Sequence, residues 1–488
     1  MHGVLETKGG KDGSRTEPVS EVQLYADRVR VYPKKISGNF RRLKWAILSV
    51  CLGLYYLAPW IRWDRGPNAP DQALLIDMTG RRGYFFAIEI WPQEVYYIAG
   101  LLMLGAFGLF LATTLAGRVW CGYACPQTVW TDLFMQVERL IEGDRNQRMR
   151  LDAQPLSLAK AAKKTLKHAA WLFISFATGG AWILYFGDAP AMVRDVFSGE
   201  ASVEAYAFIA LLTSTTYLLA GWAREQVCTY MCPWPRFQAA MLDGESLVVS
   251  YRKHRGEKRG SYKKGASWEG RGDCVDCKLC VAVCPTGIDI RDGLQLECIG
   301  CGLCVDACAS IMDRVGRPRG LIAFDTERHL RAVEAKTPYR YRLLRPRVLL
   351  YSALVVFIAL VMGVSLFFRS TAEVHVLRER SPLFVALSDG SIRNDFTVKI
   401  LNKARDPLDF ALEIEGLPAP TIKVIGLEDA GPRPFLPTPG DGVATYRVTL
   451  AVPAAALKGE QTEIRFALRA SERTKPIKRD TVFLGPRK

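Results

Sequence analysis

The chain has 488 residues, and its 65 lysines and arginines outnumber its 49 aspartates and glutamates, which gives a formal net charge of +16. This length excludes a single small domain and predicts several domains. The slightly positive mean hydropathy and the 11 tryptophans weigh against a wholly soluble protein and predict a membrane protein.

Residues 1–40 are hydrophilic and basic, and no apolar core precedes the first long apolar stretch. This pattern excludes a cleavable signal peptide, and we expect a cytoplasmic N-terminal segment. Further along, five stretches are apolar enough and long enough to span, or nearly span, a bilayer core. They lie at about 45–61, 95–116, 169–186, 205–223 and 348–368. The first four define a membrane region over residues 41–223, and the fifth lies in residues 347–369.

The basic residues of the loops predict the orientation of these spans. Arg41, Arg42 and Lys44 precede the first span, and the loops after the second span and before the fifth are rich in arginine and lysine. Loop 187–204, after the third span, carries only Arg194. Because basic loops stay in the cytoplasm, we expect a multi-pass protein of the bacterial inner membrane with a cytoplasmic N-terminus and a periplasmic tail.

A dense run of basic residues covers positions 251–264. Such a run could bind RNA, but a solvated linker close to anionic lipid explains it more simply in a membrane protein. The excess of positive charge follows from topology and contact with lipid, and we expect no nucleic-acid partner.

Two short motifs with the pattern C-x-x-x-C-P follow the second and the fourth predicted spans. The first contains Cys121 and Cys125, and the second contains Cys228 and Cys232. Cysteines four apart on a continuing helix share one face, and the proline after each pair can begin a new turn or helix. Both pairs lie on the cytoplasmic side, so four thiolates could converge on one redox site. That site would hold a further cluster or copper(I), which thiolates select; small residues packing two helix ends are the alternative.

Eight cysteines within a large cytoplasmic loop, residues 224–346, repeat one pattern twice. Residues 274–285 read CVDCKLCVAVCP, and residues 298–308 read CIGCGLCVDAC. This is the spacing of bacterial ferredoxins with two 4Fe–4S clusters. We therefore expect a ferredoxin module at about 272–316. None of the 13 cysteines follows Cys308, which suits reduced thiols in the cytoplasm and an exported tail without disulfides.

In this spacing three thiolates hold one cluster and the fourth ligand comes from the other copy of the motif. One cluster is expected on Cys274, Cys277, Cys280 and Cys308. The other is expected on Cys298, Cys301, Cys304 and Cys284. A zinc ribbon also uses C-x-x-C pairs, but it needs two pairs of ligands rather than two runs of three plus one. The predicted chemistry is one-electron transfer.

Residues 370–488 change character and alternate apolar with polar residues, as β-strands do. The clearest runs are 396–401, 409–414, 444–452 and 463–468. About seven short strands separated by proline- and glycine-containing turns predict a periplasmic immunoglobulin-like β-sandwich. We expect a docking or positioning role for this domain.

The motif order resembles that of the CcoG/FixG/RdxA family of bacterial membrane polyferredoxins, which are accessory proteins of cytochrome c oxidase assembly. The matching segments cover nearly the whole chain. They include Val31–Arg42, Trp120–Thr131, Cys228–Phe237, Cys284–Gly293 and Gly316–Ala323. The second cysteine run ends Cys308-Ala309, without the proline of many ferredoxins, and proline is not a ligand.

The resemblance implies that the protein reduces copper(II) to copper(I) for assembly of a cbb-type oxidase. The paired cysteines would then be the catalytic site, and the partners would be oxidase assembly factors or a copper transporter, with a cytoplasmic electron donor. Two other functions remain open from the residues alone. One is a ferredoxin-type relay of a quinol dehydrogenase chain, and the other is a redox-sensing assembly scaffold without turnover.

Overall fold

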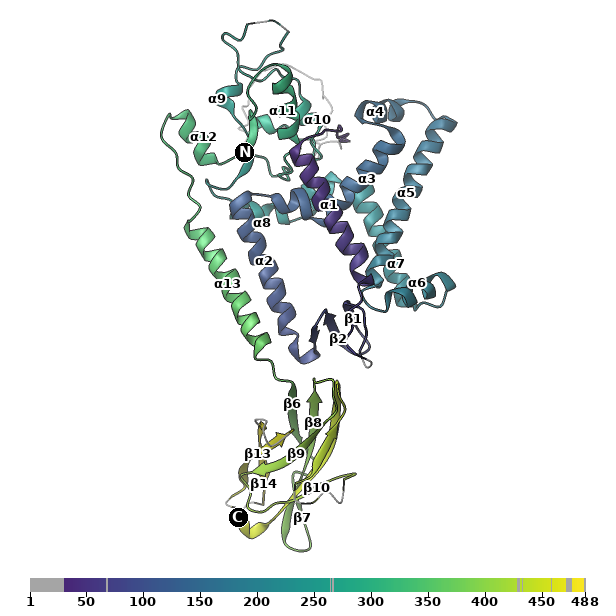
Figure 1. Ribbon diagram of the computed structural model, residues 1–488, viewed down its shortest axis with the longest axis vertical. Coiled ribbons are helices and arrows are strands. Elements are labelled where there is room, and N and C mark those ends of the chain that lie inside the picture. Colours follow the sequence, from purple (N-terminus) through teal and green to yellow (C-terminus); the bar gives the residue numbers. More distant parts are fainter. Residues whose placement is uncertain are drawn as a thin grey trace, which may run out of the picture. The chain divides into compact units, whose positions relative to one another are not determined.

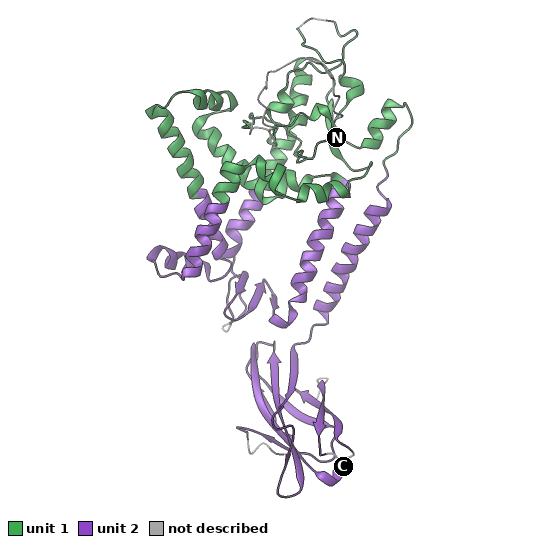
Figure 2. Cartoon of the chain, turned by 180° about the vertical axis from the view of Figure 1, so that it is seen from behind, with its two compact units in different colours: residues 1–48, 116–173, 216–341 green, residues 49–115, 174–215, 342–488 purple. Residues whose placement is uncertain are grey.

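The computed structural model divides the chain into two compact units (Figure 2). The first joins residues 1–48, 116–173 and 216–341, and the second joins residues 49–115, 174–215 and 342–488. The described residues are 30–66, 69–263, 265, 267–427, 431, 433–457, 459–470 and 476–486. Most of the predicted N-terminal segment 1–40, and the last residue of the basic run 251–264, lie outside this description.

Four of the predicted spans are helices long and apolar enough, in the described part of the chain, to cross a membrane. They are α1 (Asn39–Leu57), α2 (Tyr96–Ala116), α7 (Val203–Thr216) and α13 (Pro346–Phe367), all labelled in Figure 1. Short turns lengthen three of them. They are a 3-10 turn to Trp60, a 3-10 turn over Pro92–Glu94 before α2, and a π-helical turn over Tyr217–Ala223. Only 6–22% of each apolar stretch is buried within the chain. Lipid is the natural cover for the rest.

The third predicted span, 169–186, lies in α5 (Leu158–Ile183). The first half of this helix is rich in lysine, and its last lysine, Lys167, is buried. The apolar part of the helix is therefore too short to join the four spans above within the described part of the chain. A membrane-spanning role for α5, and hence the count of five, stays a prediction.

Other elements connect these helices. They are α3 (Pro126–Glu142), α4 (Arg145–Ala153), α6 (Ala189–Ser198) and α8 (Trp234–Met241). A small antiparallel sheet, which the sequence did not predict, comprises β1 (Leu74–Asp77), β2 (Arg82–Phe85) and β3 (Ile88–Ile90). Its strands are only three or four residues long, which leaves no clear alternation to read.

The cysteine-rich region folds around short helices within a two-stranded ribbon. The ribbon pairs β4 (Val248–Tyr251) antiparallel with β5 (Ile322–Asp325). Between the strands lie α9 (Lys253–Gly256), α10 (Leu279–Ala282), a 3-10 turn (Ile290–Asp292) and α11 (Leu303–Arg314), and α12 (Glu327–Glu334) follows. The fold therefore extends beyond the predicted module at 272–316 on both sides, because the ribbon closes it.

The C-terminal region is a sandwich of two antiparallel sheets. One sheet has the order β10-β12-β8-β6, with β7 also on β8, and the other has the order β11-β9-β13-β14. The strands are β6 (Ala372–Arg378), β7 (Val385–Ala386), β8 (Ser391–Asn402), β9 (Leu408–Glu415), β10 (Thr421–Val424), β11 (Phe435–Thr438), β12 (Gly442–Pro453), β13 (Gln461–Arg469) and β14 (Ile477–Leu484). An immunoglobulin-like sandwich was the predicted fold.

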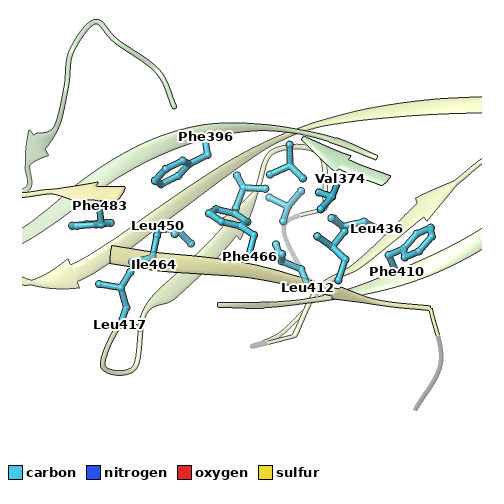
Figure 3. Packing of buried hydrophobic residues seen from close by; sticks show 14 of the residues in the cluster. Val374, Phe396, Phe410, Leu412, Leu417, Leu436, Leu450, Ile464, Phe466 and Phe483 are labelled. Carbon is cyan, nitrogen blue, oxygen red and sulfur yellow. The ribbon is translucent and has the colours of Figure 1, made fainter. Parts of the chain in front are cut away.

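The core of this sandwich follows from the alternation of the strands. Phe396 of β8 and Phe466 of β13 are fully buried, with ring centroids 5.2 Å apart. Figure 3 shows them among leucines such as Leu412 and Leu450 from both sheets. All four runs of alternating residues lie inside observed strands, β8, β9, β12 and β13. The described residues of the sandwich form nine strands, β6 to β14, rather than about seven, because short strands such as β7 and β10 alternate too briefly to be predicted.

Candidate metal centres

The two cysteine runs fold into the same loop shape. In the first run Asp276 and Lys278 have φ of 49° and 54°. At the matching positions of the second run, Gly300 and Gly302 have φ of 69° and 71°. A left-handed residue on each side of the middle cysteine turns the backbone so that three thiols face one centre. The second run uses glycine there, whereas the first run holds this conformation with ordinary side chains.

A first pocket is lined by four cysteines, three from the first run and one from α11. They are Cys274, Cys277, Cys280 and Cys308. The remaining walls are largely apolar and include Met312, Leu321 and Ile322. These cysteines are the set that the spacing predicts for one cluster. Their role as ligands stays a prediction, but the fold brings all four to one place.

A second pocket is lined by Cys298, Cys301 and Cys304 of the second run and by Cys284 of the first. Cys280 lines both pockets, so the two sites adjoin. The crossover of the fourth cysteine has a simple cause, since α10 and α11 pack against each other. Cys308 lies on α11, and Cys284 follows the end of α10 by two residues.

The donor chemistry of both pockets suits iron–sulfur clusters. Burial raises the pKa of Cys280 to about 11 and of Cys298 and Cys308 to about 12. A thiol of that kind ionises only beside a strong positive charge, which the iron of a cluster provides. Of the eight cysteines that line these pockets, Cys277 is the exposed one. The first pocket is therefore the one with a fully exposed cysteine, whereas the cysteines of the second are buried or half-buried.

The spacing of the paired cysteines predicts continuing α-helices, but the structure places them on π-helical turns instead. The turns are Trp120–Ala124 and Val227–Met231. Each is closed by the second cysteine of its pair, whose N–H bonds to the carbonyl five residues earlier: Cys125 to Trp120 at 2.9 Å, and Cys232 to Val227 at 2.8 Å. Such turns are rare and cluster at functional sites. The prolines behave as predicted, since Pro126 begins α3 and Pro233 caps α8.

The four thiols of these turns lie near one another. Burial raises the pKa of Cys121 to about 12, and the thiols of Cys125, Cys228 and Cys232 add to the rise. The Cys121 thiol also donates to Oε1 of Gln238 at 3.0 Å. Among the described residues, no three histidine, cysteine, aspartate or glutamate side chains form a group that could hold a single metal ion. The same holds for the cysteines of the two pockets, and the four paired cysteines are neighbours.

The first paired-cysteine turn packs directly against the second pocket. A Cβ on Gly122 would lie 2.8 Å from the carbonyl oxygen of Ile299 and 3.0 Å from the Cα of Cys301. The Tyr123 hydroxyl donates to the carbonyl oxygen of Cys301 at 3.0 Å. Arg118 donates to the carbonyl oxygen of Cys298 at 2.8 Å. The backbone that carries two cysteines of the second pocket is thus held by residues around Cys121.

Helix α3 holds the two paired-cysteine turns together. Gln127, two residues after Cys125, donates to the carbonyl oxygens of Leu219 at 2.8 Å and of Arg224 at 3.2 Å. Further along α3, the buried Glu138 accepts from Arg224 at 3.0 Å. Both contacts fix the chain just before the turn of Cys228. A single helix therefore begins at one pair and positions the approach to the other.

The ferredoxin module is also tied to the start of α1. The Asp306 carboxylate on α11 accepts from the backbone N–H groups of Phe40 at 3.3 Å and Arg41 at 2.8 Å. It therefore caps the free N–H groups of the first turn of α1. The backbone N–H of Lys34 donates to the carbonyl oxygen of Ala282 at 2.8 Å. The segment before the first span is in this way part of the module's surface.

Cysteine spacing identified the thiols but not the residues that position them. The positioning residues act through backbone contacts or through pairs distant in sequence. They are Arg118, Gly122, Gln127, Gln238 and Asp306. Gly122 and Tyr123 stand between the cysteines of the first motif, and Gln127 follows its proline. Their closeness to the cysteines in sequence was the only indication of a role, and Val119 and Trp120 are equally close.

Replacing Gly122 by alanine should destabilise the junction between the paired cysteines and the second pocket. The added methyl group meets backbone atoms on the Cys301 loop, which cannot move away as a flexible side chain would. Overpacking of this kind typically costs about 1–3 kcal/mol. Heating the purified protein should then bleach its visible iron–sulfur absorbance at a lower temperature. Gly244→Ala is the control, because its Cβ would meet nothing within 4 Å, and equal bleaching temperatures would refute the tight junction.

Three protein-family models match the chain. A "4Fe-4S dicluster domain" covers residues 223–327, and a "4Fe-4S binding domain" covers residues 98–143. The C-terminal region, residues 362–486, matches the "IG-like fold at C-terminal of FixG". These matches confirm two predictions, that the C-terminal region has an immunoglobulin-like fold and that the chain is an iron–sulfur protein. The first model includes Cys228 and Cys232, and the second includes Cys121 and Cys125.

Similar proteins match over most of their length. The chain is 51% identical to the nitrogen fixation protein FixG of Rhizobium meliloti over 88% of each chain. It is 49% identical to protein RdxB of Cereibacter sphaeroides, over 95% of this chain and 97% of that one. Protein RdxA of the same organism is 50% identical over 80% of this chain and 84% of its own.

Among solved structures, a FixG-related protein from Vibrio parahaemolyticus aligns with 24% of this chain and 96% of its own. Its sequence identity to this chain is 20% and the TM-score is 0.21.

Proposed function

The chain belongs to the FixG/RdxA family of iron–sulfur electron-transfer proteins, and we propose that it reduces copper(II) to copper(I) at the membrane for the assembly of a cbb-type cytochrome c oxidase. The contact of the Cys121 turn with the second cysteine pocket is the observation that supports this proposal. It gives electrons in the pockets a short path to soft thiols outside the ferredoxin module.

Each pocket has its own role in this path. Clusters held in the pockets would supply one-electron transfer without proton exchange. The exposed Cys277 makes the first pocket the place where an electron arrives. At the second pocket, Gly122 and Tyr123 hold the Cys301 loop against the first paired-cysteine turn. These contacts keep the last transfer short.

The paired cysteines receive the substrate ion. One electron from a reduced cluster converts copper(II) to copper(I), and that cluster is oxidised by one electron. Thiolates stabilise copper(I) strongly, so binding itself favours the reduced ion. Burial raises the pKa of Cys121 to about 12 and of Cys228 to about 11. Copper must therefore displace protons from these thiols as it binds.

A third iron–sulfur cluster is a second candidate for the paired cysteines. The family model over residues 98–143 is one of 4Fe–4S binding and contains Cys121 and Cys125. The side chains also do not gather around a single ion in the described residues, which suits a larger group. The protein would then pass electrons onward to a membrane carrier, as in a quinol dehydrogenase chain, or sense the redox state as a scaffold.

Measurement of iron and of copper reduction on one preparation separates these functions. Protein purified without oxygen should contain about eight irons if two 4Fe–4S clusters are present, and about twelve if the paired cysteines hold a third. After reduction by dithionite and removal of the excess, added copper(II) should appear as a copper(I)–chelator complex while the clusters are reoxidised. Reoxidation by a soluble quinone but not by copper(II) would favour the relay instead.

We further propose that the clusters are cytoplasmic and the C-terminal domain periplasmic in a bacterial inner membrane, where oxidase assembly factors or a copper transporter would meet that domain. The alternation of basic loops supports this orientation. The orientation depends on whether α5 crosses the membrane. Five crossings place the two ends of the chain on opposite sides, and four place them on the same side.

A reporter enzyme that is active only outside the cytoplasm tests the orientation. Fused after residue 488 it should be active, and fused after residue 316 it should be inactive. The reason is that an odd number of spans separates the N-terminus from the tail. The reverse pattern, active after residue 316 and inactive after residue 488, would contradict this orientation. With a cytoplasmic N-terminus, it is the pattern expected if α5 does not cross, because three spans would then precede residue 316 and α13 alone separates the two positions.

A further inference from the structure

Residues 251–263, the described part of the basic run, are attached to the first cysteine pocket. The backbone N–H of Gly260 donates to the carbonyl oxygen of Cys274 at 3.1 Å. The N–H of Gly272 donates to the carbonyl oxygen of Lys258 at 3.0 Å. Arg271 donates to the carbonyl oxygens of Gly260 and Ser261, both at 2.7 Å. The described part of this run is therefore attached to the pocket through its backbone, while most of its side chains stay exposed to solvent.

Aromatic contacts reinforce the loop. The rings of Tyr262 and Trp268 stack with centroids 4.4 Å apart. The guanidinium of Arg317 lies over the Trp268 ring at 5.0 Å, and it also pairs with the buried Asp273 beside Cys274. The loop is thus attached to the rim of the first pocket at several points, and its basic side chains have a defined location.

Two basic residues lie beside the exposed cysteine in sequence or in space. Lys278 follows Cys277 directly, and both are exposed. Arg259 lies close enough to lower the pKa of both Asp276 and Asp289, and it is itself paired with Glu257 at 2.7 Å. The two aspartates are paired with Arg291. No carboxylate of the described residues forms an ion pair with Lys258 or Lys278, so these two lysines supply the unpaired positive charge.

We propose that the surface formed by Cys277, Lys278, Lys258 and Arg259 docks a small acidic redox protein that carries flavin or an iron–sulfur cluster and gives one electron to the first pocket. The proposal rests on the proposed electron-transfer function and names the chemistry of its donor. The donor is oxidised by one electron and the first cluster is reduced by one.

Charge and position together favour this partner. Cations around the one exposed cysteine attract an acidic protein to the point where its electron has the shortest path. Electrostatic steering accelerates such encounters tenfold or more at low salt, even where the contact area is small. An anionic membrane surface would also attract these lysines, but binding to lipid would not explain why a cluster ligand is exposed beside Lys278. RNA would call for base-stacking aromatics, and Tyr262 and Trp268 are occupied by each other.

The test compares two charge-reversal variants of the full-length protein in nanodiscs. Lys258→Glu/Lys278→Glu changes the docking surface, and Lys399→Glu/Lys423→Glu makes the same change of charge on exposed residues of the sandwich. Reduced flavodoxin, an acidic flavoprotein, is the probe, and bleaching of the clusters is followed in a stopped-flow instrument. At low salt the first variant should be reduced about tenfold more slowly than wild type, and the second should match wild type. High salt should remove the difference.

Two further measurements keep the outcome interpretable. Both variants should keep the wild-type iron content and should reduce copper(II) normally after reduction by dithionite, which needs no docking. Equal flavodoxin rates for the two variants at low salt would overturn the docking surface, and weaker binding of only the first variant to anionic vesicles would then assign the lysines to lipid. Loss of copper reduction in wild type would instead contradict the proposed function and leave the docking result standing. The milder Lys258→Gln/Lys278→Gln variant repeats the test if the glutamates impair folding.

Discussion

Replacing Cys284 by serine should remove the cluster of the second pocket while leaving that of the first. Cys284 lies in the first cysteine run, but it lines the pocket of Cys298, Cys301 and Cys304. A hydroxyl is a poor ligand for the iron of such a cluster, so the iron content should fall from about eight to about four per chain. Electron flow to the paired cysteines should stop, because the second pocket is the one in contact with them.

Electron paramagnetic resonance of the reduced protein checks this result through the loss of spin coupling between adjacent clusters. Cys308→Ser is the reciprocal variant and should remove the first cluster instead, since Cys308 lines the first pocket. Cys51→Ser is the control, because this cysteine lies in α1, far from both motifs in sequence, and lines neither pocket. If Cys284→Ser abolished the first cluster and kept the second, each run would hold its own cluster and the crossover would be wrong.

Replacing Glu138 by alanine should lower the stability of the first compact unit more than almost any substitution at the surface. Glu138 is 1% exposed and pairs with Arg148 at 2.7 Å, Arg224 at 3.0 Å and Lys167 at 3.7 Å. Removing the carboxylate leaves buried cations without their partner, which typically costs about 3–5 kcal/mol. Thermal unfolding in detergent, followed by circular dichroism, measures the loss. Glu327→Ala is the control, since this exposed residue of α12 pairs only with exposed Arg331.

The same residue predicts a dependence on pH. Although burial opposes its charged form, the nearby Arg224, Arg148 and Lys167 lower the pKa of Glu138 to about 2, from an ordinary 4.5. A group with a lowered pKa in the folded protein stabilises it above the unfolded value and loses that effect as pH falls toward the folded one. As the pH is lowered from 4.5 to 2, the thermal unfolding midpoint of the wild type should therefore decrease more steeply than that of Glu138→Gln. Parallel curves for the two proteins would show that Glu138 does not carry this effect.

The sequence predicted the features that depend on short, regular spacing. Three cysteines two residues apart have few ways to face one centre, so the pattern predicted which thiols share a pocket, including the exchange of Cys284 and Cys308. Long apolar stretches and long alternating runs likewise predicted α1, α2, α7, α13 and four strands of the sandwich, because burial of one face or one stretch imposes its period on the chain.

Features that depend on contacts distant in sequence were not predictable in this way. The π-helical turns of the paired cysteines are closed by backbone bonds of Cys125 and Cys232, which leave no mark in side-chain periodicity. The role of Gly122 depends on a loop nearly two hundred residues later in the chain. The basic run 251–264 looked like a linker, because its composition is polar and its partners, such as the Cys274 carbonyl, are backbone atoms.

Electron flow from the second pocket to the paired cysteines is tested most directly by single-turnover reoxidation of the double variant Cys121→Ser/Cys125→Ser. The clusters are first reduced with dithionite, the excess is removed, and copper(II) is added in a stopped-flow instrument while cluster absorbance and copper(I) chelation are recorded. The variant should keep the about eight irons of the two pockets, stay reduced for at least ten times longer than wild type, and yield little copper(I). If it is reoxidised by copper(II) as fast as wild type and binds copper(I) equally well, the paired cysteines only pack the helix ends, and the clusters alone reduce the metal.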